Sequence, residues 1–215
     1  MVTPLHATFT VAYVLGVTPG KWAGIWRERM PRHPLVLTQT SPADAVTNLV
    51  GGDADVALLR LPIEHPLLST IPLYVEKPVV VAPKGHAIEA LDEVALTELD
   101  DLLAGEWPDT VELVAANVGV AIMPQSVARA LSRKGVIARP VSGAPETRVA
   151  LVWRETTPEV EEFIGIVRGR TPNSSRGEPT PKTPPTPKTS KSPRTSATAK
   201  SRRTARGPKG AQKKR

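Results

Sequence analysis

Residues 9–61 read FTVAYVLGVTPGKWAGIWRERMPRHPLVLTQTSPADAVTNLVGGDADVALLRL, and this stretch decides the fold class. Three short runs rich in β-branched and apolar residues, at 9–15, 35–40 and 56–61, are separated by two segments with helical spacing. The last run is apolar on both faces, which is typical of a central strand in a parallel sheet. The order strand, helix, strand, helix, strand therefore predicts an α/β fold.

Both helices in this stretch carry start signals. Thr18-Pro19 is typical of an N-cap followed by proline at the first helical position. Ser41-Pro42-Ala43-Asp44 is a capping box, and Gly51-Gly52 predicts the end of the helix that it opens. One face of the first helix is apolar, which predicts that this face packs on the sheet; it consists of Trp22, Ile25, Trp26 and Met30.

The alternation of strands and helices continues along the chain. Further strands are predicted at 71–76, 78–83, 119–123, 136–141 and 147–153. Helices are predicted at 97–104, at 110–117, at 125–134 and from Thr157-Pro158 onward. Residues 172–215 contain no large apolar side chain that could enter a core. We therefore expect a folded domain over 1–171 and a disordered tail over 172–215.

Charge is divided unevenly between these two parts. Residues 172–215 hold thirteen Lys or Arg and one acid, Glu178, whereas residues 1–171 carry a net charge of −5. A basic arm without aromatic side chains can neutralise phosphates but cannot stack on bases. This composition predicts sequence-independent contact with DNA or RNA; the alternative is a solubilising extension. The cations assigned to this contact are Lys182, Lys188, Lys191, Arg194, Lys200, Arg202, Arg203, Arg206, Lys209, Lys213, Lys214 and Arg215.

Composition disfavours several classes of protein. The chain has no cysteine, and its four histidines lie far apart, so neither a metal site nor a cofactor is expected. No acid–base partner motif surrounds Ser126, so we do not expect an enzyme. The N-terminus lacks the features of a signal peptide, and no apolar stretch approaches the ~20 residues that span a bilayer. The sequence therefore predicts a cytoplasmic protein with no membrane partner.

Three stretches resemble the effector-binding domain of LysR-type transcriptional regulators. Residues 112–129, ELVAANVGVAIMPQSVAR, resemble the family stretch LVAAGxGVALLPxSVAR. Residues 9–61 resemble the opening of that domain, including "RHP" before the second strand, and KPVVVAPKGHAI at 77–88 resembles a strand that crosses between its subdomains. The resemblance covers roughly residues 8–170. It implies the type 2 periplasmic-binding-protein fold, with two α/β subdomains joined by crossover strands and a cleft between them.

The resemblance also implies boundaries within the domain. Subdomain one would comprise about 9–75 and 147–170, and subdomain two about 88–135. The hinges would lie near 79–82 and 138–141.

Two departures from the family pattern are expected. The first strand begins some eight residues after Met1, so the family's N-terminal helix-turn-helix is expected to be absent. Only AGEWPD lies between Leu103 and Thr110, so subdomain two is expected to be shortened.

Candidate ligand-binding residues lie where strands end and helices begin. Helix N-termini at such positions offer backbone N–H groups and hydroxyls to an anion. Arg60, at the end of the third strand, could clamp a carboxylate. Alternatively, Thr18 and Ser41 only cap helices, and Arg60 pairs with Glu64 or Glu76 on the surface. The other candidates are Thr40, Gln125 and Ser126.

Two functions are compatible with these features. The first is a ligand-sensing regulatory module that binds a small anionic metabolite and contacts nucleic acid through the tail. Such a module would act as a homodimer or through a partner regulator. The alternative is a degenerate effector domain that acts only in protein interaction or dimerisation.

Overall fold

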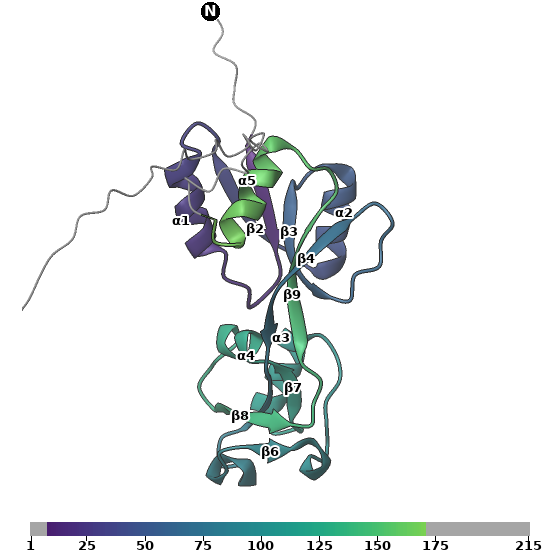
Figure 1. Ribbon diagram of the computed structural model, residues 1–215. Helices are drawn as coiled ribbons and strands as arrows, with labels where there is room; N and C mark the ends of the chain where they lie inside the picture. Colours follow the sequence, from purple (N-terminus) through teal and green to yellow (C-terminus); the bar gives the residue numbers. More distant parts are fainter. Residues whose placement is uncertain (1–7, 171–215) are drawn as a thin grey trace, which may run out of the picture. The chain divides into compact units, whose positions relative to one another are not determined.

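Residues 8–170 form two β-sheets, and the first has five strands in the order β2-β1-β3-β9-β4 (Figure 1). β1 pairs in parallel with β2 and β3, whereas β9 pairs antiparallel with β3 and β4. The strands are β1 (Phe9–Tyr13), β2 (Leu35–Gln39), β3 (Val56–Leu61), β4 (Ser69–Glu76) and β9 (Thr147–Trp153). The computed structural model describes residues 8–170, so the predictions for the basic tail lie outside the described residues.

Three helices cover the first sheet: α1 (Gly20–Arg29), α2 (Pro42–Gly51) and α5 (Pro158–Val167). Figure 1 shows α1 and α5 on one side of this sheet and α2 on the other. Between α1, α5 and the sheet lie three aromatic rings. The Phe9 and Trp26 ring centroids are 4.3 Å apart, and the Phe163 centroid lies 5.5 Å from Phe9 and 5.9 Å from Trp26. Burial of these large rings fixes the helix pair on the sheet.

The second sheet has four strands in the order β6-β8-β5-β7. They are β5 (Pro78–Pro83), β6 (Val94–Ala95), β7 (Ala121–Pro124) and β8 (Val136–Ser142). α3 (Trp107–Ala115) and α4 (Gln125–Ala130) pack against this sheet through Val111, Val114 and Val127. Among the described residues, no helix combines the length and the apolar character needed to cross a membrane.

The chain passes between the two sheets at two places. Only Lys77 separates the end of β4 from the start of β5, and residues 143–146 connect β8 to β9. The segments predicted as hinges, at 79–82 and 138–141, lie within β5 and β8, whose backbones pair with each other. Two α/β subdomains joined by crossover strands were predicted, and this architecture is confirmed.

The helix predicted at 97–104 is wrong. Leu96–Glu98 form a short 3₁₀ helix, and Leu102 then makes a single parallel bridge with Val120. The backbone N–H of Leu103 donates to the Val120 carbonyl at 2.8 Å. Pairing with the sheet therefore satisfies the backbone that a helix would otherwise have used.

Two smaller predictions about helix ends also need correction. α4 ends at Ala130 rather than at residue 134. Thr18 does not cap α1, because Pro19 occupies the N-cap position and no side chain bonds to the first turn. Ser41 does cap α2: its Oγ accepts a hydrogen bond from the Asp44 backbone N–H at 3.1 Å, as its sequence context predicts.

Candidate ligand-binding site

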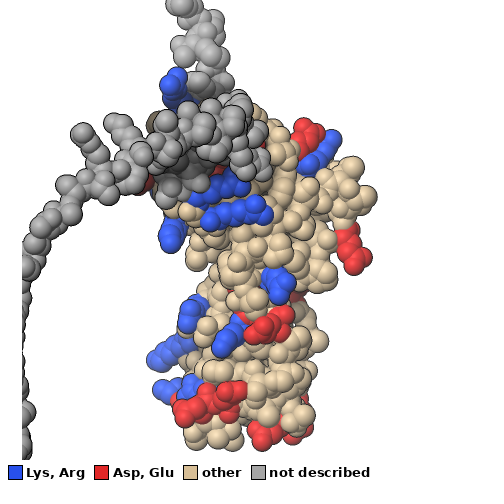
Figure 2. All heavy atoms as spheres, viewed as in Figure 1, with Lys and Arg blue, Asp and Glu red and all other residues tan. Residues whose placement is uncertain are grey.

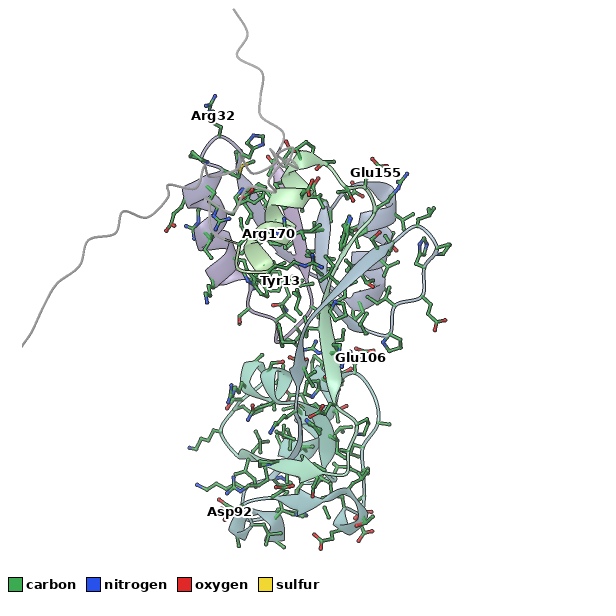
Figure 3. All side chains as sticks on the ribbon, viewed as in Figure 1. Tyr13, Arg32, Asp92, Glu106, Glu155 and Arg170 are labelled. Atoms are coloured by element: carbon green, nitrogen blue, oxygen red, sulfur yellow. The ribbon has the colours of Figure 1, made fainter. Side chains whose placement is uncertain are left out.

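A pocket of about 700 Å³ lies between the loop that follows β1 and helix α4. The first sheet contributes Tyr13, which Figure 3 labels, together with Leu37 and Gln39 from β2. The loop between β1 and α1 contributes residues 15–19, and Gly20, the first residue of α1, also lines the pocket. α4 contributes Ser126, Arg129 and Ala130. Both subdomains therefore supply walls of this pocket, and most of the lining side chains are apolar.

Gly16 brings the two walls of this pocket together. Its φ of +87° lies in the left-handed region that glycine adopts without strain. A Cβ at this position would lie 2.8 Å from Ser126 Oγ and 2.8 Å from the Val127 backbone nitrogen. The loop between β1 and α1 can therefore approach α4 this closely only because residue 16 has no side chain.

Arg60 and Ser126, two of the predicted ligand-binding residues, meet beside this pocket with Glu76 between them. Arg60 Nε lies 2.7 Å from Glu76 Oε2, and Arg60 Nη2 lies 3.3 Å from Glu76 Oε1. The same Nη2 donates to Ser126 Oγ at 3.0 Å, and Ser126 Oγ donates to Glu76 Oε1. The third guanidinium nitrogen donates to the Leu15 carbonyl at 2.9 Å. The Arg60 guanidinium is therefore already bonded to a carboxylate of the chain itself.

This ion pair is buried, which corrects the sequence-based alternative of a surface pair. The Arg60 and Glu76 side chains are 10% and 4% exposed, respectively. Of the two acids considered as partners for Arg60, the structure has Glu76 and not Glu64. Because water is largely excluded, each group depends on the other for its compensating charge.

Two aromatic side chains lie near this ion pair. The Arg60 guanidinium carbon is 5.1 Å from the ring centroid of Trp107, the first residue of α3. Burial raises the pKa of the Tyr74 hydroxyl, the Glu76 carboxylate raises it further, and Arg60 partly opposes both effects. The ion pair thus acts on a neighbouring side chain of β4, and Arg60 also contacts an aromatic ring of subdomain two.

The remaining predicted ligand-binding residues separate into two groups. Thr18 lines the pocket. Ser41 is exposed, and its hydroxyl serves the α2 cap and donates to Asp44 Oδ2 at 2.8 Å. The Thr40 backbone N–H donates to the Tyr13 carbonyl, and the Gln125 backbone N–H donates to the Lys77 carbonyl. Thr40, Ser41 and Gln125 are not among the residues that line the pocket.

Sequence reasoning missed Arg129 and the apolar wall of the pocket. Arg129 is exposed and lines the pocket one helical turn after Ser126. Residues three apart share a helix face, so the spacing of 126 and 129 was the available signal. Among residues 8–170, the Arg129 guanidinium makes no ion pair and no hydrogen bond.

A second hollow, of about 380 Å³, lies in subdomain two and is lined by Glu98, Asp100 and Asp101 together with His86. Figure 2 shows acidic side chains gathered at the end of subdomain two, near Asp92, which Figure 3 labels. Within the described part of the chain, no three His, Asp or Glu side chains are grouped so that they could hold a metal ion. The pocket beside α4 is therefore the candidate site.

Known proteins share this architecture. The sequence model of the LysR substrate binding domain matches residues 20–104 and 102–172. This chain belongs to the LysR substrate-binding-domain family. The two matched segments of the LysR domain overlap at residues 102–104, next to the stretch between Leu103 and Thr110 where subdomain two is expected to be shortened. The resemblance drawn from residues 9–61, 77–88 and 112–129 is thereby confirmed.

Curated relatives of this LysR domain include two described as probable hydrogen peroxide-inducible genes activators. The Streptomyces viridosporus protein is 26% identical over 200 residues, covering 74% of this chain and 64% of that protein. The Mycobacterium avium protein is 29% identical over 194 residues, covering 73% and 61%. The chain thus spans a little over three fifths of the length of these relatives.

Solved structures share the fold at low sequence identity. The reduced OxyR regulatory domain from Pseudomonas aeruginosa has a TM-score of 0.61 and 20% identity, covering 76% of this chain and 94% of that one. The BenM effector binding domain with its effector benzoate has a TM-score of 0.65 and 18% identity, covering 76% and 91%. At such identities the likeness establishes the fold alone.

Proposed function

We propose that this chain is the ligand-sensing module of a LysR-type transcriptional regulator. Its ligand is a small metabolite with an apolar body and one anionic group, and it binds in the pocket between the β1–α1 loop and α4. The observation that carries the proposal is the combination, in one pocket, of apolar walls with the guanidinium of Arg129, which makes no ion pair or hydrogen bond within residues 8–170. Occupancy of the pocket would control transcription, in line with the names of the curated relatives, which describe activators of genes.

The chemistry of the pocket supports this class of ligand. Leu15, Val17 and Leu37 offer apolar surface against which a hydrocarbon ring or chain loses contact with water. Arg129 offers a planar donor fork that suits a carboxylate, and Thr18 adds a hydroxyl. BenM, a fold neighbour, is described with benzoate as its effector, a compound of this class. We therefore assign the anion to Arg129 and not to Arg60, which Glu76 already neutralises.

A peroxide signal is the other input that the names of the relatives suggest. Oxidation of a protein thiol proceeds through a thiolate to sulfenic acid or a disulfide. This chain has no cysteine, so neither product can form in it. Binding of a small molecule is therefore the input we favour.

Replacing Arg129 with glutamine should weaken binding of an aromatic carboxylate about ten- to a hundredfold. A hydrogen bond to a charged group contributes roughly 1.5–3 kcal/mol, which corresponds to that change in Kd. Isothermal titration calorimetry of the full chain with benzoate and a panel of small aromatic and aliphatic carboxylates measures this effect.

Arg133→Gln is the matched control for the Arg129 experiment. It removes the same charge four residues further along, in the loop after α4 and outside the pocket, where Arg133 pairs with Glu112 on the exposed surface. Exposed pairs contribute little, so this variant should bind and fold like the wild type. Equal affinity of the Arg129 variant and the wild type, or no binding by any carboxylate in the panel, would refute the proposed ligand class.

The interaction-module alternative is favoured by one observation. β2 is an edge strand of the sheet that residues 8–170 form, and its Val36 and Leu37 are 45% and 37% exposed. Exposed apolar edges are common places for pairing with another chain, so we propose β2 as a dimer contact. A protein that dimerises but binds no member of the carboxylate panel would fit this alternative better.

We also propose that the basic tail contacts nucleic acid through its phosphates. If about six of its thirteen cations engage a duplex at once, log Kd should change with log salt concentration with a slope near 5, at roughly 0.9 per phosphate. Fluorescence anisotropy with two unrelated duplexes should give the same affinity for both. A chain ending at residue 171 should lose this binding, and salt-independent binding would contradict the proposal.

A further inference from the structure

The Glu76 carboxylate has the contacts that a bound carboxylate ligand would have. Oε1 accepts from Ser126 Oγ and from Arg60 Nη2, and Oε2 accepts from Arg60 Nε. Thr147 Oγ1 also donates to Oε2, at 3.4 Å. All these donors belong to other segments of the chain, and none is a sequence neighbour of Glu76. Such a set of convergent donors around two oxygens is a carboxylate-binding site.

We propose that Glu76 is an intramolecular ligand, which keeps the anion site formed by Arg60 and Ser126 closed to small carboxylates in the wild-type chain. This role of Glu76 adds to the proposed function. It rests on that function in one respect only, which is that Ser126 also lines the pocket beside α4. A metabolite in that pocket is then selected by Arg129 and the apolar walls, because Arg60 is already neutralised. Glu76 is thus a specificity-determining residue of the module.

The position of Glu76 explains how one side chain can serve both subdomains. Glu76 is the last residue of β4 and is separated from β5 by Lys77 alone, at a passage between the two sheets. Arg60 lies in β3 of subdomain one, whereas Ser126 is in the first turn of α4 in subdomain two. The Gln125 backbone N–H adds a bond at 3.0 Å to the Lys77 carbonyl beside Glu76. The internal carboxylate therefore ties α4 to the crossover.

Removing the internal carboxylate should open the site to an external one. Glu76→Ala deletes the CH₂–COO⁻ part of the side chain, which matches acetate in size and charge. Arg60 would remain buried with no compensating charge, a state that strongly favours uptake of an anion. Acetate is therefore the probe, and chloride at equal ionic strength is its control.

The test measures the Tm of the full-length Glu76→Ala chain against acetate concentration. Above the Kd of acetate, each tenfold increase should raise the Tm by about 3–5 °C, since binding to the folded state alone stabilises it. The wild type should not respond beyond the chloride control. Glu76→Gln is the matched variant in which an uncharged side chain still fills the space, so acetate should not act on it. Arg60→Met/Glu76→Ala should also lose the response.

Two further experiments, a refolding comparison and a double variant, distinguish the possible outcomes. If Glu76→Ala is unfolded in chloride, its refolding from urea is compared in acetate and in chloride, and recovery in acetate alone is expected. Recovery in neither salt, or an equal acetate response of Glu76→Ala and wild type, overturns the inference. Glu76→Ala/Arg129→Gln should still respond to acetate. This variant separates the inference from the proposed function, which fails if the wild type binds no carboxylate through Arg129.

Discussion

Replacing Arg60 with methionine is expected to lower the free energy of unfolding by about 3–5 kcal/mol. The substitution leaves the Glu76 carboxylate, 4% exposed, without a counter-charge, and it leaves the Leu15 carbonyl without its donor. Removing one member of a buried ion pair typically has a cost of this size, because the remaining charge stays desolvated. Urea denaturation followed by tryptophan fluorescence measures the difference.

A double variant separates the charge effect from the loss of packing. Arg60→Met/Glu76→Met removes both charges and keeps apolar volume, so its stability should lie close to that of the wild type. Arg60→Lys keeps the charge but lacks the planar fork that bonds Glu76, Ser126 and Leu15 together, so it should be intermediate. An Arg60→Met chain within about 1 kcal/mol of wild type would show that the pair is not buried in solution as it is in the structure.

The second large effect is expected for Trp26→Ala, at about 3–5 kcal/mol. The Trp26 side chain is fully buried, is stacked on Phe9 at 4.3 Å, and donates from its indole N–H to the His33 carbonyl at 2.9 Å. Truncation would therefore leave a cavity between α1 and the sheet and would remove the hydrogen bond to the His33 carbonyl. Thermal or urea unfolding of the variant gives the loss directly.

Trp22 on the same helix is the matched control for Trp26. Its side chain is only partly buried and packs at the margin of the same core. Trp22→Ala should therefore cost clearly less than Trp26→Ala, because less apolar surface returns to water. Equal losses at the two positions would mean that α1 is rotated on the sheet relative to the structure.

Several features of this protein were determined by the sequence alone, because they depend on neighbours along the chain. The Ser41 and Thr157 caps need only a hydroxyl and a backbone N–H three residues later, and both bonds form. The strands predicted at 56–61 and 78–83 have the predicted bounds, since their apolar runs leave no other way to be buried. These local signals, in order, also carried the resemblance to the LysR domain.

Other features were decided only by the tertiary structure. Residues 97–104 carry a helix start signal, yet the backbone of Leu102 and Leu103 instead pairs with Val120, a partner that local propensity cannot reveal. Thr18 is a residue type that often caps helices, but Pro19 occupies the N-cap position of α1, and Thr18 instead lines the pocket beside α4.

The candidate site shows most clearly which features the sequence determined and which only the tertiary structure decided. Sequence position brought Arg60 and Ser126 into one hypothesis, since Arg60 lies at the end of a strand, Ser126 follows another, and such strand ends are expected to face a common cleft. Their distances in sequence from Glu76, 16 and 50 residues, carry no signal that the three side chains meet. A buried guanidinium requires an anion, but only the folded chain decides whether that anion is a ligand or the protein's own carboxylate. Here β3, β4 and α4 converge on Glu76, so the chain's own carboxylate compensates the desolvated charge on Arg60. Unlike a free ligand, this carboxylate loses no translational entropy when it pairs with Arg60.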